Sequence, residues 1–93
     1  MISLGTEGFW KAYASLPAPV KKRARASYRL WRENPDHPSL RFKKIHQTDP
    51  IFSVRIGSGW RAVGVLQGSN MIWYWIGSHA DYDTLVSQFR RKA

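Results

Sequence analysis

The stretch "IFSVRIGSGWRAVGVL" (residues 51–66) places two short extended segments on either side of a glycine-rich turn. In the first segment, Phe52, Val54 and Ile56 alternate with polar side chains, which is typical of a strand with one buried face. The intervening Gly-Ser-Gly suits a tight connection between two antiparallel strands. The stretch therefore predicts a β-hairpin with strands at residues 51–56 and 60–66.

Beyond the hairpin, the chain continues with one more strand and a helix. The segment "MIWYWI" (71–76) is apolar on both faces, which indicates a central strand or one covered on both sides. The segment "ADYDTLVSQFRR" (80–91) follows, and its apolar residues recur at the spacing of an amphipathic helix. The apolar side of this helix is formed by Tyr82, Leu85, Val86 and Phe89.

Before the hairpin, the periodicity is helical. Residues 6–15 predict a short helix with Thr6 as N-cap, and the two prolines of "LPAP" (16–19) interrupt it. A second helix is predicted over residues 18–33, where an apolar face and a basic stripe lie on different sides. The apolar face comprises Val20, Ala24, Ser27, Tyr28 and Trp31, and the basic stripe comprises Lys22, Arg25, Arg29 and Arg32.

After the prolines at positions 35 and 38, the segment "LRFKKI" (40–45) alternates weakly and predicts a first strand. The resulting order is two helices, three or four strands and a short helix. This order predicts an α+β fold, in which an N-terminal helical hairpin packs on a twisted three- to four-stranded antiparallel sheet and a short helix closes the chain. The length predicts a single domain spanning residues 1–93.

The charge is strongly unbalanced, because 15 Lys and Arg face 6 Asp and Glu and leave a net charge of +9. Such a surplus on a small domain points to a polyanionic partner, with nucleic acid as the first candidate and an acidic protein as a second. The chain has no cysteine, no basic-then-apolar leader and no apolar run near the ~20 residues of a membrane span. We therefore expect a cytoplasmic protein without a membrane partner.

Cations concentrate on the predicted strands, at Arg41, Lys43, Lys44, Arg55 and Arg61. Between residues 40 and 80 the only acid is Asp49, so a solvated face of mixed charge explains this set poorly. An unbalanced cationic sheet face repels itself, which indicates that an anion binds there. The basic stripe of the second helix is explained more simply as its solvent side.

His79 follows the last strand, where a sheet can hold a functional side chain rigidly. A histidine with its ordinary pKa suits proton transfer near neutral pH, although a lone histidine is more often structural. Tyr82 is explained most simply as a core contact of the last helix. The three histidines are far apart in sequence and no phosphate-binding glycine loop precedes a helix, so neither a metal site nor a cofactor is expected.

Three ordered motifs add a family resemblance: "NPDHPSLRFKKI" (34–45), "FSVRIGSGWRAVGV" (52–65) and "IWYWIGSHADYDTLV" (72–86). Together they resemble the RelE/ParE superfamily of bacterial type II toxins. Within it, they resemble the cytotoxic translational-repressor branch with a terminal "IGSHxxYD" motif. The resemblance implies a toxin that enters the ribosomal A site and cleaves messenger RNA without metal, leaving a 2′,3′-cyclic phosphate. It also implies a cognate antitoxin as partner in a hetero-oligomer.

The resemblance carries over to named positions of this chain. It implies that Arg41, Lys43 and Lys44 bind RNA, and that the catalytic set is drawn from His79, Arg61, Arg55 and Tyr82. The same scaffold also carries gyrase poisons, so a ParE-type gyrase inhibitor is an alternative. A catalytically silent RNA- or protein-binding module is another.

Overall fold

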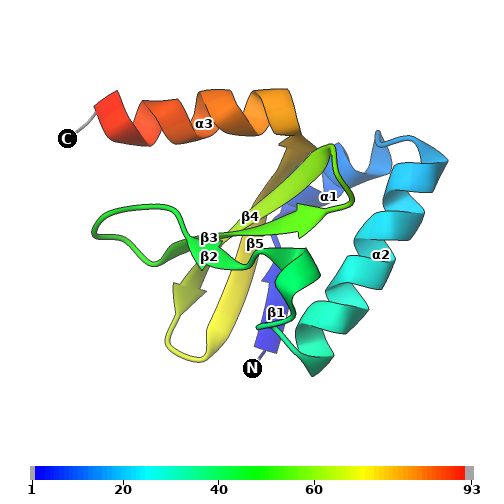
Figure 1. The fold of residues 1–93 in the computed structure, drawn as a ribbon, viewed down its shortest axis with the longest axis horizontal. Coiled ribbons are helices and arrows are strands. Elements are labelled where there is room, and N and C mark those ends of the chain that lie inside the picture. The colour runs from blue at the N-terminus through cyan, green and yellow to red at the C-terminus, as the bar shows by residue number, and fades with distance from the viewer. Residues whose placement is uncertain (1, 92–93) are drawn as a thin grey trace.

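Five strands form one sheet in the order β1-β5-β4-β3-β2 (Figure 1). The computed structural model describes the backbone of residues 2–91 and the side chains of residues 2–89. Along the chain the elements are β1 (Ile2–Gly5), α1 (Glu7–Ala14), α2 (Ala18–Glu33), the short 3-10 helix η1 (Pro38–Leu40), β2 (Lys43–Lys44), β3 (Ile51–Ile56), β4 (Trp60–Gln67), β5 (Asn70–Ser78) and α3 (His79–Arg91).

The predicted hairpin is confirmed, since β3 and β4 pair antiparallel with Ile56 opposite Trp60 across the turn. Gly57 adopts a φ of +58°, which a residue without a side chain tolerates best. The register between β4 and β5 shifts between Val63 and Gly64, so a bulge bends this pair of strands. The turn at Gly57 and the bulge between β4 and β5 therefore set the pairing of the central strands.

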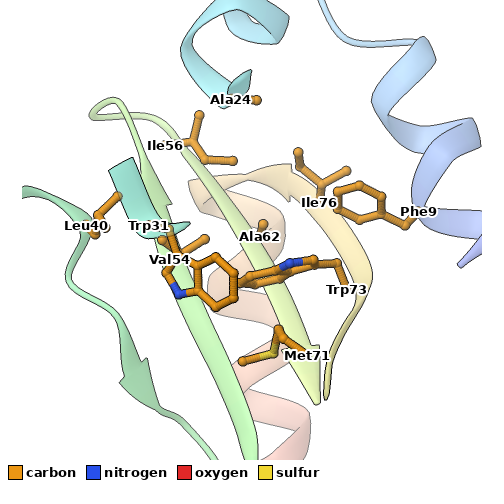
Figure 2. Close-up of a cluster of buried hydrophobic side chains, with 10 residues drawn as sticks. All are labelled: Phe9, Ala24, Trp31, Leu40, Val54, Ile56, Ala62, Met71, Trp73 and Ile76. Atoms are coloured by element: carbon orange, nitrogen blue, oxygen red, sulfur yellow. The ribbon is translucent and has the colours of Figure 1, made fainter. Parts of the chain in front are cut away.

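The main core lies between α1, α2 and one face of the sheet (Figure 2). Trp31 of α2 meets Trp73 of β5 edge to face, with ring centroids 5.3 Å apart. Phe9 of α1 and Ile76 of β5 belong to the same cluster. Val20, Ala24 and Trp31 of the predicted apolar face of α2 are buried, whereas Tyr28 of that face stays 38% exposed. The two helices are therefore confirmed, and the buried face of α2 is narrower than predicted.

The helix α3 packs on the opposite face of the sheet. Neighbouring side chains of a strand point to opposite faces, and Val54 belongs to the core beneath α2. Its neighbour Ser53 is 2% exposed and hydrogen-bonds Tyr82 of α3. The sheet is therefore covered on both faces, which agrees with the apolar character of β5 on both sides.

The first strand, β1, was not predicted. It lies at the edge of the sheet and pairs parallel to β5, with Ile2 opposite Asn70. Ile2 and Leu4 stay more than half exposed, at 61% and 55%. Backbone pairing and a 3.0 Å hydrogen bond from Trp73 Nε1 to Ser3 Oγ hold β1 in place. Because β1 buries no apolar face, its short sequence shows no alternation from which the strand could be predicted.

The predicted strand at residues 40–45 is shorter than expected, because only Lys43 and Lys44 pair with β3. Arg41 has a φ of 44°, in the left-handed region that no strand adopts. Leu40, which precedes it, is 1% exposed and belongs to the core. The chain therefore turns at Arg41 after Leu40 enters the core, and pairing begins only afterwards.

Candidate active site

Arg55 and Arg61 lie directly opposite each other across the β3–β4 hairpin. Arg55 Nε donates to Gly57 O at 2.8 Å, and Arg61 Nη1 donates to Trp60 O at 2.8 Å. Each guanidinium is thus tied to the backbone of the turn and keeps other N–H donors for a ligand. Two like charges placed opposite each other in a sheet are unfavourable unless an anion joins them.

Burial and charged neighbours act on Arg61. Partial burial lowers the pKa of Arg61 most, and the positive charges of Arg55 and Arg41 lower it further, while Tyr82 and Asp83 raise it. Three of these neighbours, Arg55, Arg41 and Tyr82, were predicted as site residues from the sequence, and they come from separate parts of the chain. The fold therefore gathers them around one guanidinium that lacks water on part of its surface.

His79 is the first residue of α3 and stands beside the hairpin turn. Its backbone N–H donates to Gly59 O at 2.8 Å, so the start of the helix is fastened to the turn between the two arginines. Ser78 Oγ accepts from the backbone N–H of Asp81 at 3.1 Å and caps the helix. The imidazole of His79 remains half exposed and within reach of a substrate.

The carboxylate of Asp83 lies against this imidazole. His79 Nδ1 and Asp83 Oδ2 are 3.2 Å apart, one turn along α3. Asp83 was not predicted, although its spacing of four residues from His79 on a predicted helix was a signal for it. The pair provides an imidazole with a neighbouring carboxylate, an arrangement that can orient a proton-transferring histidine.

Tyr82 is 8% exposed, and its hydroxyl lies 3.0 Å from Ser53 Oγ in the interior. Its ring also faces the guanidinium of Arg61, whose Cζ lies 5.8 Å from the ring centroid. Both contacts use Tyr82 to hold α3 against the strands that carry the arginines. The contribution of Ser53 was not predicted, because nothing in the alternation of β3 distinguishes a buried serine from an exposed one.

The three predicted RNA-binding residues are divided between the two faces of the sheet. Lys43 pairs with Ser53 and shares its face, which is also the face of Arg55. Lys44 pairs with Phe52, so it lies on the other face, at the side of the main core. Arg41 lies outside the strand, but its charge acts on Arg61, so the fold brings it to the same region.

Within residues 2–91, no three histidine, aspartate or glutamate side chains gather as metal ligands would. No helix in the same range is long and apolar enough to cross a membrane.

The model of the ParE-like toxin domain matches residues 18–84, which run from α2 through the hairpin to the start of α3. The chain belongs to this family. The matched range of this ParE-like toxin domain includes Arg55, Arg61, His79 and Asp83. No curated protein sequence matches the chain.

Solved structures are similar to this ParE-like toxin domain in fold. A chain of the RelB–RelE antitoxin–toxin complex from Methanococcus jannaschii superposes with a TM-score of 0.68 at 19% identity, covering 87% of this chain and 96% of that one. The YoeB/ParE toxin from Agrobacterium tumefaciens gives 0.67 at 18% identity, with coverages of 85% and 99%. YafQ from E. coli gives 0.69 at 12% identity, with coverages of 86% and 94%.

Proposed function

We propose that this ParE-like toxin domain is the toxin of a type II toxin–antitoxin pair and that it inhibits translation by cleaving messenger RNA on the ribosome without a metal ion. The observation that carries the proposal is the placement of an accessible histidine at the same hairpin turn as two opposed arginines. Metal-free RNA cleavage needs a proton-transfer group next to cations that bind the phosphate, and both are present at this turn.

The reaction is an attack of a ribose 2′-oxygen on its own 3′-phosphate. The O2′–P bond forms, the P–O5′ bond breaks, and the products are a 2′,3′-cyclic phosphate and a 5′-hydroxyl. One group must take the proton from the 2′-hydroxyl and another must supply a proton to the leaving 5′-oxygen. His79 serves as the base or the acid of this step.

The two arginines act on the phosphate. Negative charge builds on the non-bridging oxygens in the transition state, and Arg61 and Arg55 stabilise it with the N–H donors that their backbone hydrogen bonds leave over. Arg41 and Lys43 hold the RNA backbone next to them. Lys44 points to the opposite face of the sheet, because it pairs with Phe52. It therefore contacts RNA only where the RNA strand passes around the edge of the sheet at β2. Tyr82 acts indirectly: its hydroxyl holds α3 against β3, and its aromatic ring packs next to the guanidinium of Arg61.

The test is cleavage of messenger on programmed ribosomes. With His79→Ala we expect cleavage to fall by about 100-fold or more, because general acid–base catalysis typically contributes 10²–10⁴-fold. Lys22→Ala, an exposed change on α2 far along the chain from the site, is the matched control and should cleave like the wild type. Cleavage that survives His79→Ala unchanged would remove His79 from the mechanism.

Expression of the protein in a bacterial host separates the other functions carried by this scaffold. Translation arrest with cut messenger supports the nuclease, whereas broken DNA with an SOS response would identify a gyrase inhibitor. No toxicity at all would identify a silent binding module.

An acidic antitoxin is the proposed protein partner. The support is the net charge of +9 and the similarity to a structure that contains an antitoxin–toxin complex. Co-expression with the product of a small adjoining reading frame should restore growth and should yield a complex that copurifies. Growth arrest that persists with every adjoining frame would count against a neighbouring antitoxin.

A further inference from the structure

The contact between His79 and Asp83 is the strongest feature of the site that the proposed reaction has not used. We propose that Asp83 is a positioning residue, whose carboxylate holds the proton of the neutral His79 ring on Nδ1 and so makes Nε2 the atom that exchanges protons with RNA. The catalytic consequence rests on the proposed function, but the effect of Asp83 on the ring does not.

The geometry defines which nitrogen is involved. Asp83 Oδ2 lies 3.2 Å from Nδ1, while Nε2 is on the far side of the imidazole and is not part of that contact. Both residues belong to one helix at a spacing of four, so the backbone of α3 holds the two side chains on one side of the helix. The start of that helix is in turn fastened to Gly59, and its buried side is fastened to Ser53 through Tyr82.

A carboxylate can only accept a hydrogen bond, and a neutral imidazole carries one N–H and one bare nitrogen. The form with the proton on Nδ1 therefore faces Asp83 favourably, whereas the form with a bare Nδ1 places two lone pairs against each other. Free histidine prefers the opposite form, with the proton on Nε2. Without Asp83 the ring would present an N–H to the substrate where a base requires a lone pair.

The surroundings give Asp83 a reason to occupy this position. On the strands, the charged group that interacts with Asp83 is the cation Arg61 of β4, whose pKa the carboxylate raises. Asp83 thus contacts the imidazole of His79 and lies near enough to Arg61 for the two charges to interact.

Asp81 offers a matched control on the same helix. It is an exposed acid in the first turn of α3, and it lines a shallow depression with Thr84 and Gln88 whose lining does not include His79. Asp81→Asn and Asp83→Asn remove the same charge two positions apart. Any effect of net charge or of helix-end electrostatics is common to both variants, whereas the effect on the His79 tautomer belongs to Asp83 alone.

The direct test is nitrogen NMR of the histidine rings in the free protein, read at the high-pH end of a titration where the rings are neutral. In the wild type we expect His79 to carry its proton on Nδ1. In Asp83→Asn we expect the population to move toward the Nε2–H form, and Asp83→Glu should restore the wild-type signal. Asp81→Asn should leave it unchanged. An unaltered His79 tautomer in Asp83→Asn overturns the proposal.

The catalytic test is single-turnover cleavage of messenger on programmed ribosomes. We expect Asp83→Asn to lower the rate about 10-fold, toward the lower end of what loss of a carboxylate behind a functional histidine costs, because this pair is partly exposed. Asp83→Glu should recover most of the rate, and Asp81→Asn should retain it. If Asp83→Asn shifts the tautomer as expected but cleaves at the wild-type rate, the carboxylate sets the tautomer of His79 but the reaction does not depend on it. That result also overturns the proposal.

The two readouts keep this inference apart from the proposed function. If the wild-type protein does not cleave messenger, the proposed function fails while the NMR experiment still decides whether Asp83 sets the tautomer. If the wild type cleaves and His79→Ala abolishes cleavage, but Asp83→Asn changes neither readout, only the inference about Asp83 fails.

Discussion

At the scale of single residues, Gly64 shows how tightly β4 and β5 approach each other at the bulge, where Tyr74 of β5 is the extra residue. A Cβ added at Gly64 would lie 2.8 Å from the Trp73 ring and 2.9 Å from the backbone oxygen of Ile72. A side chain can shift a little, but the carbonyl of a paired strand cannot move without breaking the ladder. The glycine is therefore required by the close passage of β5, which carries Trp73 into the core.

Gly64→Ala should therefore lower stability. We expect a loss of about 2 kcal/mol, within the usual 1–3 kcal/mol range for overpacking, and a fall in Tm of roughly 8–16 °C for a domain of this size. Gly59→Ala is the control, since a Cβ there meets nothing within 4 Å. Thermal and urea denaturation of the two variants measures the difference. Equal stabilities would show that β4 and β5 separate easily at the bulge.

At the scale of elements, α3 is joined to the sheet by one buried polar contact. Tyr82 reaches from α3 to Ser53 of β3, and both residues are under 10% exposed. A buried hydroxyl without a hydrogen-bond partner gives up its hydrogen bonds to water and gains none in return. Together with the hydrogen bond from the His79 N–H to Gly59 O, this contact fixes the helix that carries His79 over the arginines.

Tyr82→Phe should cost about 1–2 kcal/mol of unfolding free energy, because it strands the hydroxyl of Ser53. Ser53→Ala should cost a similar amount, and the double variant should cost clearly less than the sum, since neither partner is then left alone. Urea unfolding gives the three values. A strictly additive double variant would show that the two hydroxyls do not interact in solution.

At the scale of the whole molecule, charge is distributed over both sides of the sheet. Arg55, Arg61 and Lys43 occur on the face of α3, whereas the cations of α2 lie beyond the opposite face. Binding of a polyanion depends on the number of phosphates that the cations neutralise, and each adds about 0.7 to the slope of log affinity against log salt for a single strand. Salt dependence can therefore locate the RNA.

Arg55→Gln should reduce that slope by about 0.7 and weaken RNA binding similarly across sequences. Lys22→Gln, on the exposed side of α2, should leave the slope unchanged. Binding of a short single-stranded RNA at several salt concentrations measures both slopes. An equal reduction in the two variants would mean that RNA also covers α2, which contradicts the site assigned to the α3 face.

Much of this molecule was predictable from local pattern. The helix at Ala18–Glu33 and the strand at Ile51–Ile56 begin and end where periodicity and prolines predicted, because each buries a face that its own sequence encodes. The pairing of Arg55 with Arg61 also followed from the short turn between them. By contrast, β1 is an exposed edge strand without a buried face, and no local pattern predicts its parallel pairing with the far end of the chain.

Local sequence pattern was enough to predict the fold class, the cationic hairpin and the histidine at the start of the last helix, since each depends on residues close together along the chain. Long-range packing places α3 over the arginine face, turns Lys44 away from that face and joins Tyr82 to Ser53. Those outcomes depend on contacts between segments far apart in sequence. Such contacts form only when helices pack on both faces of the sheet, and no single segment of the sequence specifies that packing.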